Sequence, residues 1–369
     1  MNNYILYRLE ALSENCPDAN EKATIDAERA YHMARVGYFT EAHALLRSIR
    51  ANPTVSSTPV VVIWLILSEG IVDFFENLSQ ASHDRFRRAY ALSVATKQNS
   101  LRALAAAWLA HTEFMRQDYE AMIDAANDCL SFYPDENKSA QSRIFIVLAS
   151  AHMSCGNFGA SRRFFEMARN IAVVDGDRAT LGAIAYNQAA LMLNGYRLRN
   201  IFDSGEQIDL ALVSITVESA TNFQEITKNT ALGELISICS ARSLINKKQY
   251  SNALKILEDL RASDSTYSAG IKSETLAVEY AYCLANLGDL TRTLQALAGL
   301  DIKLCTNLHH DDKVILLSQL VEIYNILGLK SEILDLSDQI AEAQSAHLAQ
   351  ISKMRSAMQR LKFAGDLCD

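Results

Sequence analysis

The sequence predicts an all-α protein built from helical hairpins that repeat about every 40 residues. Apolar residues recur three and four positions apart along most of the chain, for example at Leu101, Leu104 and Trp108, and this spacing is typical of amphipathic helices. No stretch shows the sustained apolar and polar alternation that predicts a strand. Only 4 prolines and 14 glycines occur among 369 residues. Because these two residue types interrupt helices, their scarcity favours helical structure.

The hairpin repeat is defined by short turns at nearly constant spacing. Each turn is marked by an anchor, which is the second residue after the turn glycine or its equivalent. The anchors are Phe39, Ser79, Tyr119, Phe158, Leu198, Tyr250, Leu290 and Lys330. Their separations are 40, 40, 39, 40, 52, 40 and 40 residues. A fixed period of this length is typical of helical solenoids, in which each hairpin packs on the next.

Two further positions keep the same register as the anchors. Nine residues before each anchor stand Ala30, Gly70, Ala110, Ala149, Ala189, Ala241, Ala281 and Val321. Ten residues after each anchor stand Ile49, Ala89, Cys129, Ala168, Ile208, Leu260, Leu300 and Ile340. Small residues let the two helices of a hairpin approach closely, and the apolar residues are expected to seal neighbouring hairpins together.

The elements follow in chain order. Residues 1–21 are expected to form a short capping helix that ends at Cys16-Pro17-Asp18, because a terminal repeat must cover its own apolar face. Residues 22–216 hold hairpins one to five, and residues 217–345 hold hairpins six to eight. The longer interval after Leu198 places additional residues around 217–228, as a longer second helix or as a loop that divides the solenoid.

The end of the chain carries a long helical pattern, which continues from Lys330 to a point near Gly365. Residues 346–369 are therefore predicted to form a projecting helix and tail. Its apolar stripe, with the spacing of a coiled-coil seam, consists of Ile351, Met354, Met358 and Leu361. We expect this stripe to mediate homodimerisation or coupling to an effector. The alternative is a cap over the last hairpin.

Three turns resemble those of the tetratricopeptide repeat, in which an aromatic residue follows Gly-Asp or a similar pair and an alanine comes shortly after. They are Gly37-Tyr38-Phe39-Thr40-Glu41-Ala42, Gln117-Asp118-Tyr119-Glu120-Ala121 and Lys248-Gln249-Tyr250-Ser251-Asn252-Ala253. The resemblance covers residues 22–345, with a period longer than the ~34 residues of the family. It implies a right-handed superhelix of about eight hairpins, with the first helix of each hairpin on the concave side.

Such a concave surface would bind a peptide or protein, and the register of the first helices selects its candidate residues. They are Tyr31, Arg35, Trp64, Phe74, Phe75, His111, Phe114, Arg143, Tyr186, Asn187, Arg242, Tyr282 and Glu322. Arg35, Arg143 and Arg242 are suited to carboxylates or phosphates, through charge-assisted hydrogen bonds. The aromatic residues would serve as apolar anchors, or alternatively would belong to the core between helices.

There is no phosphate-binding loop, dinucleotide fingerprint, His-Glu-x-x-His, Gly-x-Ser-x-Gly or pair of Cys-x-x-Cys motifs. We therefore expect no catalytic residues, no cofactor and no metal. The cluster His309-His310-Asp311-Asp312 has two interpretations, a metal or phosphohydrolase site and the acidic start of the next helix.

Composition bears on compartment and on partners. The N-terminus has no secretory pattern, and the apolar segment 59–67 is too short to span a bilayer. Seven scattered cysteines suggest a reducing cytoplasm, and a formal charge of −8 argues against nucleic-acid binding.

The predicted function is a non-catalytic cytoplasmic adaptor or regulatory sensor that binds a protein or peptide, including acidic segments. One alternative is the sensory module of a larger signalling protein, for example one that controls a nucleotide-cyclase domain through the C-terminal helix. An enzyme or nucleic-acid binder on a helical scaffold is disfavoured.

Overall fold

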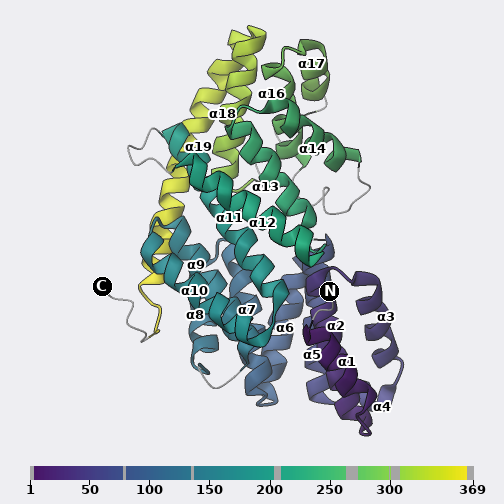
Figure 1. Cartoon of the computed structure of the whole chain (residues 1–369). Coiled ribbons are helices and arrows are strands. Elements are labelled where there is room, and N and C mark those ends of the chain that lie inside the picture. Colours follow the sequence, from purple (N-terminus) through teal and green to yellow (C-terminus); the bar gives the residue numbers. More distant parts are fainter. Residues whose placement is uncertain are drawn as a thin grey trace. The chain divides into compact units, whose positions relative to one another are not determined.

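The computed structural model describes residues 4–77, 80–133, 137–202, 209–262, 273–298, 300 and 308–363. These residues form 18 α-helices and no strand (Figure 1). The all-α class predicted from the apolar periodicity is therefore confirmed. The chain divides into two compact units. Unit 1 comprises Met1–Asn187, Phe223–Leu232 and Lys353–Asp369, and unit 2 comprises Gln188–Asn222 and Gly233–Ser352.

Unit 1 is a row of helices that pack on their neighbours in sequence. Its helices are α1 (Tyr4–Glu14), α2 (Ala19–Val36), α3 (Phe39–Arg50), α4 (Pro53–Ser56), α5 (Pro59–Asn77), α6 (Gln80–Ala95), α7 (Asn99–Met115), α8 (Tyr119–Leu130), α9 (Lys138–Ser154), α10 (Phe158–Asp175) and the start of α11 (Arg178–Phe202). The hairpins are α2 with α3, α5 with α6, α7 with α8, and α9 with α10. The first helices also pack on one another, as α2 does on α5 and α7 on α9.

Unit 2 is also built from helices that pack on their neighbours in sequence. It contains the rest of α11, most of α12 (Leu210–Thr227), α13 (Gly233–Asn246), α14 (Tyr250–Ala262), α16 (Ser273–Asn286), α17 (Leu290–Ala298), α18 (His310–Leu327) and most of α19 (Lys330–Met358). Helices α13, α14, α16, α18 and the start of α19 enclose one apolar core. The boundary between the units falls inside α11, at Asn187, and not at the predicted division after residue 216.

The predicted turns lie where the anchors place them in six hairpins. Their anchors are the first residues of α3, α8, α10, α14, α17 and α19. The side chains of Asp118 and Asn157 accept hydrogen bonds from the backbone three residues on, which caps α8 and α10. The anchor Ser79 lies outside the described residues.

The small residue nine positions before the anchor is required by close helix packing. Ala30, Ala110 and Ala149 are completely buried in unit 1. At Gly70, a Cβ atom would lie 2.7 Å from Cε1 of Phe86 on the paired helix. The repeat register read from the sequence therefore corresponds to real contacts between the helices of a hairpin.

The turn predicted at Leu198 is wrong, because α11 runs without interruption from Arg178 to Phe202. The two residues on either side of the expected bend are held in the helix by tertiary contacts. Arg197 forms a buried ion pair with Glu279, and Leu198 packs in a cluster with Val314. The additional residues of this repeat are helical: α11 has 25 residues, and α12 includes 217–227.

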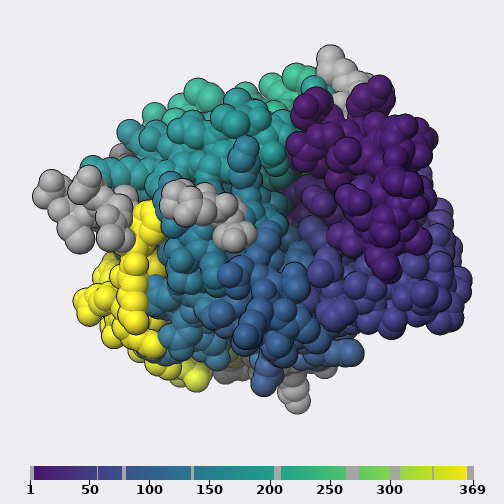
Figure 2. Space-filling model, turned by 90° about the horizontal axis from the view of Figure 1, so that it is seen from below, coloured from purple at the N-terminus to yellow at the C-terminus, as the bar shows by residue number. Residues whose placement is uncertain are grey.

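The C-terminal helix also differs from the prediction. Helix α19 ends at Met358 and not near Gly365. Residues 353–363 do not project, because within unit 1 they lie against α8, α9 and α10 (Figure 2). Met354 in the predicted stripe is only 3% exposed. The chain itself therefore covers part of the surface expected to pair with a partner.

Candidate functional site

Six of the predicted groove residues come together in one buried cluster of unit 1, here called the inner cluster. It is built on α2, α5, α7 and α9, the first helices of four successive hairpins, and on the start of α11. The cluster consists of Tyr31, His32, Arg35, Trp64, Phe74, Trp108, His111, Ser139, Arg143, Asp177 and Thr180. Their side chains contact one another, so they do not line an open groove as expected.

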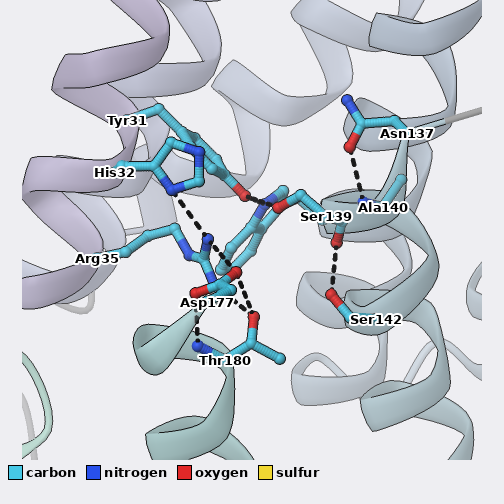
Figure 3. A network of polar contacts seen from close by, with 10 residues as sticks. Tyr31, His32, Arg35, Asn137, Ser139, Ala140, Ser142, Asp177 and Thr180 are labelled. Carbon is cyan, nitrogen blue, oxygen red and sulfur yellow. Dashed lines mark hydrogen bonds and ion pairs between the residues drawn. The ribbon is translucent and has the colours of Figure 1, made fainter. Parts of the chain in front are cut away.

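Arg35 is paired within the cluster by the start of α11 (Figure 3). Its Nη1 donates to Oδ2 of Asp177 at 2.9 Å, and its Nη2 donates to Oγ1 of Thr180 at 2.6 Å. Asp177 also accepts the backbone N–H of Thr180 at 3.0 Å, which caps α11. One carboxylate thus begins a helix and neutralises a buried guanidinium. The charge-assisted bond of Arg35 expected with a partner is made inside the chain.

Tyr31 links three of the first helices through its hydroxyl group. The indole Nε1 of Trp108 donates to Tyr31 Oη at 2.9 Å. Ser139 Oγ lies 3.2 Å from the same oxygen (Figure 3). The ring of Trp64 meets Tyr31 edge to face at 5.7 Å between centroids. These contacts fix the aromatic residues of α2, α5 and α7 as core, the alternative that the sequence left open.

Arg143 reaches the same cluster from α9 with a different set of contacts. Its Cζ lies 4.0 Å from the ring centroid of Trp108, in a cation–π contact. Its Nη1 lies 3.3 Å from Nδ1 of His111, whose ring stacks on Trp108 at an interplanar angle of 7°. Among the residues that the structure describes, no carboxylate forms an ion pair with Arg143.

The charge states in the cluster follow from burial and from the two arginines. Burial and the nearby Arg35 lower the pKa of His32 to about 3. Burial and the Arg143 guanidinium hold the pKa of His111 well below its usual value. Although burial alone would raise it, the field of Arg35 brings the pKa of Asp177 down to about 2. Both histidines are therefore neutral and Asp177 is ionised at neutral pH.

Unit 2 holds the predicted residues Arg242 and Tyr282 in a second polar cluster. Arg242 Nε and Arg197 Nη2 both donate to Oε1 of Glu279, at 2.9 and 2.8 Å. Glu279 has no exposed surface. Tyr282 donates to Oε2 of Glu322 at 2.5 Å, and burial is the largest cause of its raised pKa. Arg242 is thus paired within the chain in the same way as Arg35.

The remaining predicted groove residues are more dispersed. Phe75 is buried, and Phe114 lies 6.5 Å from Tyr119 between ring centroids. Asn187 uses its side-chain amide within its own helix, donating to the Ala183 carbonyl at 2.7 Å. Tyr186 is half-buried on the same helix. Of these four, Phe75 does contact the inner cluster, since its ring centroid lies 5.0 Å from that of Phe74 and 6.1 Å from that of Trp108.

A second candidate site was not predicted, and it holds residues 360–363, here called the tail. We call it the tail-docking surface, and its residues are Glu120, Asp124, Asn127, Tyr133, Phe145 and Phe164. Asn127 forms two hydrogen bonds with the backbone of residues 360–362. Its Nδ2 donates to the Arg360 carbonyl at 3.1 Å, and its Oδ1 accepts from Lys362 N–H at 2.7 Å.

Side chains of the tail are also recognised by this surface. Arg360 forms ion pairs with Glu120 and Asp124 on α8. The ring of Phe363 lies among Tyr133, Phe145 and Phe164, with centroid separations between 5.6 and 6.1 Å. The surface therefore recognises a cation, a stretch of main chain and an aromatic ring in sequence.

The two sites differ in how far their residues can be predicted from the sequence. Asp177 stands directly before a helix, and aspartate is one of the preferred residues at that capping position. No pattern marks Asn127, because its partners lie more than 230 residues away in the chain. Its role depends on tertiary packing alone.

The cluster at 309–312 forms the start of α18, where His309 is the cap residue and Asp311 and Asp312 lie in the first turn. Asn194 of α11 donates to Oδ2 of Asp311 at 2.8 Å. In the described ranges, no group of three or more His, Cys, Asp or Glu side chains is arranged to hold a metal ion. Within the same ranges, none of the helices has the length and apolarity needed to span a bilayer.

Comparison of the sequence with protein-family models and with curated proteins gives no match.

Proposed function

We propose that this chain is a non-catalytic scaffold of tetratricopeptide-like hairpins that binds peptide segments of partner proteins. It would act as an adaptor or a regulatory sensor. The observation that carries the proposal is the tail-docking surface, on which unit 1 already holds a non-helical segment, residues 361–363, and the arginine before it. The resemblance of the turns to tetratricopeptide repeats and the repeat register support the same proposal.

The chemistry of this surface suits peptide recognition. A side-chain amide that binds one carbonyl and one N–H holds main chain independently of sequence. Selectivity then comes from side chains. Here two carboxylates select a cation, and three aromatic rings select a Phe three positions later. The preferred segment would therefore carry Arg-x-x-Phe, the pattern of Arg360 and Phe363.

The concave surface of the first helices stays part of the proposal in a restricted form. In unit 1 its residues are engaged with one another, so an extended peptide would have to displace side chains such as Tyr31. A cytoplasmic location is also proposed, and the free Cys129, Cys239 and Cys283 support it. A homodimer through the stripe at 351–361 would require the tail to leave unit 1.

The test is direct binding of the tail sequence in trans. A fluorescent peptide of residues 356–363 is titrated with the natural full chain and with the full-length double variant Arg360→Ala, Phe363→Ala. We expect saturable anisotropy with the double variant, whose own tail is weakened, and weaker binding to the natural chain, where the site is occupied.

Two matched controls define the contacts in this experiment. A peptide in which alanine replaces the residue corresponding to Phe363 should bind at least about tenfold more weakly, since burial of one aromatic ring is worth more than 1.4 kcal/mol. Adding Asn127→Ala to the double variant should also weaken binding. If the double variant binds neither peptide, the surface only caps the chain and the proposal is wrong.

A further inference from the structure

The inner cluster contains a buried positive charge that the described residues do not balance. Arg143 is 3% exposed, and no ion pair joins it to a carboxylate within the described ranges. Its closest polar contact is the neutral ring of His111. A buried cation is normally paired because removal from water penalises the charged form. That penalty is visible in Arg143, whose pKa is lowered to about 10 by burial and by Arg35.

The charges of the cluster can be counted residue by residue. Arg35 and Arg143 are cationic, Asp177 is the one buried carboxylate in contact with either, and His32 and His111 are neutral. Asp177 is already bonded to Arg35 and Thr180. The described side chains of the inner cluster therefore carry one net positive charge.

Unit 2 offers an internal comparison, because it also holds two buried arginines around one carboxylate. There Arg197 and Arg242 share Glu279, and a second carboxylate, Asp312, contributes to the field at both. In unit 1 a second carboxylate, Asp175, contributes to the field at Arg35, and Asp177 contributes to the field at Arg143 without forming an ion pair with it. Within the described residues, Arg143 therefore differs from Arg197 and Arg242 in that no carboxylate is bonded to its guanidinium.

The geometry of Arg143 limits what could supply the missing charge. Trp108 covers one face of its guanidinium at 4.0 Å, and the N–H donors lie along the edge, where an anion would bind. The edge of a guanidinium matches a planar carboxylate through two parallel N–H donors. A further donor nearby, Nε of Arg35, is buried without a hydrogen-bond partner.

We propose that the inner cluster binds a small organic monocarboxylate against the edge of Arg143. One negative charge would neutralise the cluster, whereas a phosphate dianion would leave an excess negative charge in a buried site. The ligand must be small because Arg143 is almost fully enclosed. This site is separate from the tail-docking surface and does not depend on peptide binding there.

The chain provides its own probe for this site. Its two tryptophans, Trp64 and Trp108, both belong to the inner cluster and lie 5.7 and 6.4 Å from Tyr31. Intrinsic tryptophan fluorescence of the full chain therefore reports on the cluster alone. Acetate and propionate are titrated at constant ionic strength against chloride, and melting temperature is measured in parallel.

We expect a saturable fluorescence change and a rise in melting temperature with the carboxylates and not with chloride, because a ligand of the folded state stabilises it. Arg143→Lys keeps the positive charge but loses the two parallel N–H donors of the guanidinium, and it should weaken binding by about tenfold or more. Arg143→Met should abolish binding, and the exposed Arg87→Met should leave it unchanged. Since Arg143→Met removes a buried charge, its own folding is checked by circular dichroism, and Arg143→Lys serves if it fails.

The proposal is overturned if neither carboxylate changes fluorescence or melting temperature beyond the effect of chloride. An equal response of the natural chain and Arg143→Lys would also overturn it, because the bound anion would then be elsewhere. A response to phosphate alone would contradict the monocarboxylate assignment. A stronger response to an acidic peptide with blocked ends than to acetate or propionate would contradict a small free ligand.

Discussion

Arg35 and Asp177 form a buried ion pair across 142 positions of the sequence, with 2.9 Å between Nη1 and Oδ2. The side chains are 2% and 4% exposed. The pair joins α2, the first helix of the first hairpin, to the beginning of α11. Within unit 1, contacts of this kind join the first helices of the hairpins to one another and to α11. Buried charge pairs and the repeat register lead to four predictions.

Asp177→Ala should lower the free energy of unfolding by about 3–5 kcal/mol, because it leaves Arg35 charged and buried without its partner. The measurement is urea denaturation followed by circular dichroism. The exposed Asp84→Ala is the matched control and should change stability by no more than about 0.5 kcal/mol. The double variant Arg35→Met, Asp177→Leu should recover most of the loss. A double variant as unstable as Asp177→Ala would show that packing, and not the unpaired charge, is responsible.

His32 should make the protein sensitive to mild acid. Burial and Arg35 lower its folded-state pKa from 6.5 to about 3, so the unfolded chain binds a proton at a pH where the folded chain does not. The stability is greatest above pH 6.5 and is lost as the pH falls from 6.5 towards 3, by up to about 5 kcal/mol.

The contribution of His32 is isolated by comparing melting temperature against pH for the natural chain and for His32→Asn, which retains an acceptor for Arg35. The slope between pH 6.5 and 4 should be shallower in the variant. His43→Asn, at a more exposed position, should keep the natural slope. Parallel curves for the natural chain and His32→Asn would contradict the assignment.

Gly70→Ala should destabilise unit 1 by about 1–3 kcal/mol, because the added Cβ overpacks the contact with Phe86. Gly159 of α10 is the matched control, since a Cβ there meets no atom within 4 Å. Gly159→Ala should stabilise the chain by up to about 1 kcal/mol through helix propensity. Thermal unfolding of the two variants measures both effects, and equal shifts would refute the repeat register.

Arg242→Glu should destabilise unit 2 by about 3 kcal/mol or more, because it places a second carboxylate beside the fully buried Glu279. The repeat register placed Arg242 on an open concave surface, whereas the structure pairs it with Glu279 inside unit 2. The exposed Lys255→Glu is the control of equal charge change. Thermal unfolding of both variants, followed by circular dichroism, measures the difference in stability. Two identical curves would mean that the ion pair of Arg242 with Glu279 does not stabilise unit 2.

The repeat register was accessible from the sequence because it depends on local requirements. A small residue is needed where the two helices of a hairpin touch closely, as Gly70 shows. The turn residues around Phe39 have counterparts around Tyr119 and Tyr250. The exception at Leu198 has a non-local cause. A glycine and an asparagine before it resemble a helix end, but Glu279 and Val314 from distant helices stabilise the continued helix.

The inner cluster could be predicted from the sequence only in part. The helical register correctly selected Tyr31, Arg35 and Arg143 as residues of the first helices, since residues at equivalent repeat positions share a face. Whether that face is open depends on how far α2 stands from the start of α11, and this distance is not encoded in any single repeat. The tail-docking surface could not be predicted from the sequence, because Asn127 and Phe363 come together only in the folded chain.

The helical class, the hairpin period and the positions where helices must touch can be read from the sequence, because each follows from side-chain spacing within about 40 residues. The pairing of charges depends on tertiary packing. Arg35 finds Asp177, Arg242 finds Glu279, and Arg143 is left without a carboxylate in the described residues. The reason is physical: electrostatic pairing in a buried site depends on separations of a few ångströms between residues that the sequence places far apart.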